Sequence, residues 1–87
     1  MAFKIDFTKE AVKSVNKLPE DIKIGLKEKI VWLADNSDNI IHRKLKGNYY
    51  SEVFKLRFGN YRILYRINKT NKTITIETVG HRKSIYK

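Results

Sequence analysis

Residues 51–79 read SEVFKLRFGNYRILYRINKTNKTITIETV, and this stretch decides the fold. Apolar and polar residues alternate along it with the period of two that is typical of half-buried strands. Turn-forming residues interrupt the alternation twice, at 58–60 and at 68–72. The stretch therefore predicts three consecutive strands, at 51–58, 61–67 and 73–79, joined by short connections into an antiparallel meander.

Each predicted strand has one apolar face and one face that carries charged and polar residues between a few apolar ones. The residues expected on the apolar face are Phe54, Leu56, Phe58, Tyr61, Ile63, Tyr65, Ile67, Ile74 and Ile76. The residues expected on the opposite face are Val53, Lys55, Arg57, Arg62, Leu64, Arg66, Thr75, Glu77 and Val79. A shift of one residue in the strand register would bury the arginines and expose the phenylalanines. The alternation therefore predicts a basic face that is open to solvent.

The first half of the chain supplies what covers the apolar face. Residues 3–7 alternate as a strand does, and Thr8 can cap a helix whose apolar positions recur through Leu18. Pro19 separates this helix from a second one, which ends before a polar loop at 35–39. The prediction is one α+β domain, residues 1–87, of order β-α-α-β-β-β, with a helical hairpin on one face of a small antiparallel sheet.

The composition excludes several classes of protein. The chain has 87 residues, 41% of them hydrophobic, with no cysteine and two histidines. It has no apolar run that could span a membrane, no glycine-rich phosphate loop and no carboxylate cluster for Mg²⁺. We therefore expect a soluble cytoplasmic protein that needs neither a metal ion nor a cofactor.

The charge is unevenly distributed. Residues 1–42 contain seven lysines and seven acidic residues, whereas residues 43–87 contain twelve basic residues and only Glu52 and Glu77 as acids. The second half thus carries the whole net charge of +10. This asymmetry indicates a surface that binds a polyanion, with nucleic acid as the first candidate. The alternative is a solvated basic surface that gives only non-specific attraction.

Several residues in the basic half have side chains suited to phosphate chemistry. Arg57, Arg62 and Arg82 can each offer paired donors to phosphate oxygens, and Lys55 supplies a compact charge. Tyr86 lies among cations, where it can either stack on a base or anchor the chain end. A cleavage reaction without a metal favours RNA over DNA, because the 2′-hydroxyl of RNA is an internal nucleophile.

Among the titratable residues, His81 and Glu77 each have two interpretations, and His42 has one. His81 is either a proton carrier or a hydrogen-bonded structural histidine at a strand end. Glu77 is either a general base or the charge partner of an arginine. His42 has no motif around it and is interpreted as incidental.

Three motifs resemble the RelE/ParE toxin superfamily: Leu45-Lys46-Gly47, the run from Phe54 to Tyr65, and the run from Val79 to Tyr86. The resemblance covers about the whole chain. It implies the toxin of a type II toxin–antitoxin pair that cleaves mRNA in the ribosomal A site. In that reaction the 2′-hydroxyl attacks and leaves a 2′,3′-cyclic phosphate or a 3′-phosphate, without a metal.

The resemblance also implies residue roles. Lys55 matches a catalytic lysine, Arg62 the arginine that stabilises the transition state, Arg82 the general acid and Tyr86 the stacking tyrosine. Val53 stands where the family prototype has a second lysine, so the general base is Lys55 alone, Lys46, Glu77 or His81. Further RNA-binding residues are expected to be Lys46, Arg57, Arg66, His81 and Lys83.

The family also implies partners: mRNA, the ribosome and an antitoxin with an acidic toxin-binding segment, in a hetero-oligomer. Two other functions stay open. One is a ParE-like inhibitor of DNA gyrase that has no nuclease activity. The other is a plain RNA-binding module, which would show salt-dependent affinity without toxicity.

Overall fold

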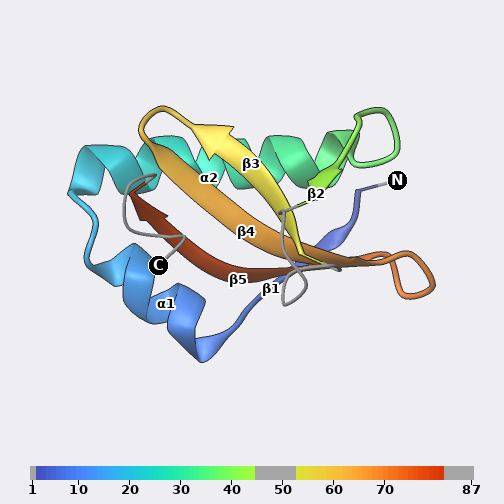
Figure 1. Ribbon diagram of the computed structural model, residues 1–87, viewed down its shortest axis with the longest axis horizontal. Helices are drawn as coiled ribbons and strands as arrows, with labels where there is room; N and C mark the ends of the chain where they lie inside the picture. Colours follow the sequence, from blue (N-terminus) through green and yellow to red (C-terminus); the bar gives the residue numbers. More distant parts are fainter. Residues whose placement is uncertain (1, 45–52, 82–87) are drawn as a thin grey trace.

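The computed structural model describes residues 2–44 and 53–81, and these form an α+β fold (Figure 1). The elements within them are β1 (Lys4–Phe7), α1 (Lys9–Asn16), α2 (Glu20–Asn36), β2 (Arg43–Lys44), β3 (Phe54–Phe58), β4 (Tyr61–Asn68) and β5 (Thr73–His81). The predicted class and the order of strand, helical hairpin and meander are confirmed. No helix in the described ranges is both long and apolar enough to cross a membrane.

The strands of the described residues form one sheet in the order β1-β5-β4-β3-β2. The β3–β4–β5 meander is antiparallel, as predicted. The first strand, however, joins β5 in parallel, with Ile5 opposite Ile74, so the whole sheet is mixed. At the other edge β2 pairs with β3. The sequence pattern did not predict β2, because two residues are too few to show a period.

The core lies between the helices and one face of this sheet. Figure 1 shows α2 running across the strands, while α1 lies beside β5 and β1. The apolar side chains of α2 pack against those of β4 and β5. Fully or nearly fully buried members are Leu26, Leu33, Ile63, Tyr65, Ile74 and Ile76. The alternation of the meander thus places its predicted apolar face under the helices.

A β-bulge in β5 changes this alternation at one point. Tyr65 lies opposite Ile76, but the preceding residue Leu64 lies opposite Thr78, so Glu77 is an extra residue without a partner in β4. Beyond the bulge the strand is one residue out of phase, and Val79 turns into the helix-facing core with 3% of its surface exposed. The prediction that Val79 lies on the basic face is therefore wrong.

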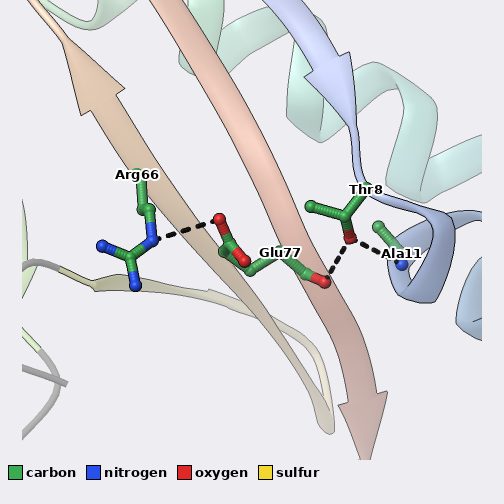
Figure 2. Close-up of polar contacts among 4 residues, drawn as sticks. All are labelled: Thr8, Ala11, Arg66 and Glu77. Carbon is green, nitrogen blue, oxygen red and sulfur yellow. Dashed lines mark hydrogen bonds and ion pairs between the residues drawn. The ribbon is translucent and has the colours of Figure 1, made fainter. Parts of the chain in front are cut away.

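The bulge is joined to the start of α1 by Thr8, the predicted N-cap (Figure 2). The Thr8 hydroxyl donates a hydrogen bond to the backbone carbonyl of Glu77 (2.8 Å) and accepts one from the backbone N–H of Ala11 (3.0 Å). One side chain thus satisfies a helix-end donor and a carbonyl of the bulge. On the other side of β5, the Glu77 carboxylate accepts a hydrogen bond from Arg66 Nε (3.1 Å).

The Thr8→Ala variant should lower the free energy of unfolding by about 1–2 kcal/mol, because it removes the cap of α1 and leaves the bulge carbonyl without its donor. Urea denaturation measures the change. Thr70→Ala, in the exposed turn between β4 and β5, is the control. Equal losses in the two variants would show that the Thr8 contacts do not stabilise the fold.

A second polar network ties the segment after α2 to the sheet, and it involves His42. The imidazole Nε2 lies 2.8 Å from the Ser37 carbonyl, and Nδ1 lies 2.7 Å from the Tyr65 hydroxyl. A carbonyl only accepts, so the neutral ring carries its hydrogen on Nε2 and accepts one from Tyr65 at Nδ1. The ring also packs against Phe54, with centroids 5.5 Å apart.

The interpretation of His42 as incidental is therefore wrong: it is a structural residue that holds the chain just before β2. Sequence could not show this, because the Tyr65 hydroxyl that bonds His42 comes from β4, 23 residues further along the chain. Burial also raises the pKa of the Tyr65 hydroxyl above its usual value, so this group stays protonated and available as a donor.

The Tyr65→Phe variant should lose about 1–3 kcal/mol of unfolding free energy, because the half-buried Nδ1 of His42 would lose its donor. Tyr61→Phe is a matched control. The Tyr61 ring packs on His81 with centroids 5.8 Å apart, and its hydroxyl has no hydrogen-bond partner in the described part of the chain. Thermal unfolding of both variants tests the prediction, which fails if Tyr65→Phe is as stable as Tyr61→Phe.

Candidate nucleic-acid interface

Four cationic side chains meet on the sheet face that points away from the helices. The register places Arg43 of β2 opposite Lys55 of β3, and Arg57 of β3 opposite Arg62 of β4. Directly opposed residues share a face, and so do residues two apart on one strand. Arg43, Lys55, Arg57 and Arg62 therefore form one group, which we call the basic quartet.

The basic quartet lines an open cleft of about 870 Å³ at the β2–β3 edge of the sheet. The cleft brings β2, β3 and β4 together with the segment before β2 and with Lys29 of α2. The residues that line it are Lys29, Ile40, Ile41, His42, Arg43, Lys44, Lys55, Leu56, Arg57, Arg62 and Tyr65. Six of these residues are basic and none is acidic, so the cleft is suited to an anionic ligand.

Among the described residues, no acidic side chain forms an ion pair with a member of the quartet. Within residues 2–44 and 53–81 the ion pairs are Lys23–Glu20, at 3.6 Å, and Arg66–Glu77, at 3.1 Å. Neither pair includes a member of the quartet. Like charges directly opposite each other on neighbouring strands destabilise a sheet. The sheet contains two such pairs side by side, and this cost is removed when an anion binds between them.

The predicted basic face is confirmed for Arg57 and Arg66, which are exposed, but it is not uniformly open to solvent. Lys55 and Arg62 are half-buried, and two apolar residues of the same face, Val53 and Leu64, are only 5% and 4% exposed. Neither Val53 nor Leu64 belongs to the core that lies between the helices and the sheet. Lys55 lies directly opposite Leu64, so a buried apolar side chain stands beside this half-buried cation on the same face.

Arg62 has a further restraint. Its Nη1 donates to the Tyr61 backbone carbonyl at 3.3 Å. This contact uses one of the five donors of the guanidinium and leaves the others for a ligand. The arginine is thus held close to its own strand, where it lines the cleft.

The other predicted site residues are distributed differently. Glu77 lies on the basic face and is bound to Arg66, which confirms its interpretation as the charge partner of an arginine. His81 lies opposite Tyr61 and packs against its ring, because the bulge has moved the end of β5 out of phase. The structure therefore does not bring His81 together with Lys55 and Arg62. Lys46, Arg82, Lys83 and Tyr86 lie outside the described residues.

Arg43 is the member of the quartet that sequence analysis missed. A basic residue in a short segment before a meander has no periodic signal of its own. Only the pairing of β2 with β3 shows that it faces Lys55. As for metals, the described residues contain no group of three His, Asp or Glu side chains that could hold an ion.

Comparison with known proteins identifies the family. Residues 5–86 match the model of the ParE toxin of the type II toxin–antitoxin system parDE. The mRNA interferase toxin RelE of Escherichia coli K12 is 31% identical over 83 residues, which cover 95% of this chain and 86% of that protein. Toxin RelE3 of Methanocaldococcus jannaschii is 35% identical over 88 residues, which cover 95% of this chain and 94% of that protein.

Solved structures give the same result for the fold. The toxin–antitoxin complex RelBE2 of Mycobacterium tuberculosis contains a chain that superposes with a TM-score of 0.82 at 29% identity, with 94% of this chain and 93% of that chain covered. The toxin chain of the intact RelBE complex of E. coli gives a TM-score of 0.76 at 27% identity, with 92% of this chain and 96% of that chain covered. The sequence match spans the meander, the basic quartet and both helices, and on this ground the chain belongs to the RelE/ParE family of type II toxins.

Proposed function

We propose that this toxin is a ribosome-dependent mRNA endoribonuclease that inhibits translation in the cytoplasm and works without a metal ion. The observation that carries the proposal is the basic quartet, which is a cleft floor of four cations without a paired carboxylate in the described residues. Such a floor stabilises the extra negative charge that a phosphodiester gains during cleavage. The relative named an mRNA interferase toxin is 31% identical over 83 residues, which cover 86% of its length, and this similarity supports the proposal.

The proposed reaction begins with the RNA itself. The 2′-hydroxyl attacks the adjacent phosphorus and loses its proton to a base, and the bond from phosphorus to the 5′-oxygen breaks. The departing oxygen takes up a proton, so the products are a 2′,3′-cyclic phosphate and a 5′-hydroxyl end. The nucleophile belongs to the substrate, and therefore the protein has to supply only position, charge and proton transfer.

Within this reaction we assign charge stabilisation to Arg62, supported by Arg57 opposite it. Lys55 is the preferred base, because it lines the cleft beside Arg62 whereas Glu77 is engaged by Arg66 and His81 packs on Tyr61. Arg82 as the acid and Tyr86 as the stacking residue follow from the family motif. Lys46 and Lys83 would add phosphate contacts.

We further propose that an antitoxin neutralises this chain in a hetero-oligomer, with an acidic segment over the basic face. The similar toxin chains of M. tuberculosis and E. coli were solved in toxin–antitoxin complexes. The helical side also offers an apolar groove of about 370 Å³. It is lined mainly by Ile5, Phe7, Val15, Leu26, Ile30 and Val31. Phe7 and Val31 are 44% and 51% exposed there, as is typical of a surface that a partner covers.

A second candidate function is inhibition of DNA gyrase, because the matching family model bears the name of the ParE toxin. Such an inhibitor would act by binding a protein and would hydrolyse nothing. Primer extension on mRNA after brief induction separates the two candidates. Cleavage products within translated reading frames support the nuclease, whereas intact mRNA with accumulating DNA breaks supports gyrase inhibition.

Arg62→Ala should reduce the rate of mRNA cleavage on programmed ribosomes by about 100-fold or more, because the transition-state charge loses its nearest guanidinium. Lys55→Ala should cause a loss of similar size. Single-turnover cleavage with purified ribosomes measures both rates. Lys69→Ala, in the exposed turn between β4 and β5, removes the same unit of charge far from the cleft and should cleave at the wild-type rate.

Thermal unfolding of each variant checks that its fold is intact. If folded Arg62→Ala and Lys55→Ala proteins cleave as fast as the wild type, the quartet does not perform the chemistry and the proposed mechanism is wrong.

A further inference from the structure

Arg43 is the one member of the basic quartet to which the proposed cleavage reaction assigns no task. Its position is nevertheless specific. It lies on β2, at the outer edge of the sheet, directly opposite Lys55, and it lines the same cleft as Arg57 and Arg62. An exposed arginine beside a lysine, without an ion pair in the described residues, is either a chance surface charge or half of an anion site.

The local structure favours an anion site. The preceding residue, His42, is fixed by hydrogen bonds to Ser37 and to the buried Tyr65 hydroxyl, so the backbone that carries Arg43 is held in place. A chance surface charge needs no such anchoring. The fixed backbone also keeps two like charges opposed across β2 and β3, which a free chain would avoid.

The spacing within the quartet suggests two separate subsites. Lys55 and Arg57 are two residues apart on β3, which places the Arg43–Lys55 pair about 7 Å along the strand from the Arg57–Arg62 pair. One guanidinium can engage two oxygens of a single phosphate. The Arg57–Arg62 pair is thus sufficient for the scissile phosphate, and Arg43 on the edge strand is placed for a second phosphate.

We infer that Arg43 binds the phosphate that neighbours the scissile phosphate in the bound RNA strand, on the outer side of Lys55. Arg43 acts in binding only, because it lies on the edge strand of the sheet and on the far side of Lys55 from Arg62. This inference rests on the proposed function, since it takes RNA as the ligand. It adds a residue from β2 to a site that the sequence pattern placed on the meander alone.

The test is the salt dependence of RNA binding. The probe is a short single-stranded RNA with methylated 2′-hydroxyls, which cannot be cleaved, and fluorescence anisotropy gives its dissociation constant between about 50 and about 200 mM salt. For single strands, each lost phosphate contact makes the slope of log K against log salt shallower by about 0.7. Arg43→Ala should show this change, with affinity about fivefold weaker at low salt.

Two variants serve as controls. Lys69→Ala removes the same charge outside the cleft and should keep the wild-type slope. Arg43→Lys should keep the slope too, because the charge remains. Arg43 is exposed on an edge strand, so the fold of Arg43→Ala should be intact; Arg43→Gln, with a longer polar side chain, replaces it if thermal unfolding shows otherwise.

The outcomes distinguish this inference from the proposed function. A slope for Arg43→Ala equal to that of Lys69→Ala, with a shallower slope for Arg62→Ala, overturns the Arg43 subsite and leaves the nuclease proposal standing. Unchanged slopes for Arg43→Ala, Arg57→Ala and Arg62→Ala alike would overturn the Arg43 subsite, and the cleavage rates of Arg62→Ala and Lys55→Ala on ribosomes would then decide the nuclease proposal.

Discussion

The alternation of side chains across the meander is the constraint on which the rest of this structure depends. A strand presents successive residues to opposite faces, so burying Ile63 and Tyr65 of β4 under the helices necessarily places Arg62 and Arg66 on the other face. The apolar residues supply the stabilisation, and the cations follow because they occupy the intervening positions. The hydrophobic core therefore also fixes the geometry of the candidate interface.

The bulge at Glu77 adjusts this constraint at a single residue. It lets β5 keep Ile76 and Val79 in the core although they are three residues apart. The extra residue then serves both faces. Its carbonyl accepts from Thr8 on the helix side and its carboxylate binds Arg66 on the basic side. A single position thus links the start of α1 to the charge pattern of the opposite face.

Electrostatics separates the basic quartet from the rest of the basic surface. Arg66 has its charge balanced by Glu77, whereas Arg43, Lys55, Arg57 and Arg62 form two opposed like-charge pairs without a carboxylate in the described ranges. Binding of a polyanion lowers the free energy of such an arrangement. The electrostatic attraction is stronger where water is partly excluded, because the effective dielectric constant is lower there. Half-buried Lys55 and Arg62 meet this condition, because Val53 and Leu64 beside them are buried.

By itself the sequence determined the class of fold, the meander, the Thr8 cap and the faces of Lys55, Arg57 and Arg62, because these depend on period and on local capping chemistry. Tertiary structure alone decided the rest. The parallel pairing of β1, the phase of Val79 after the bulge, the contacts of His42 and the place of Arg43 opposite Lys55 each depend on a partner far away in the chain. A pattern along one strand records which residues avoid water, but it does not record which strand lies beside it.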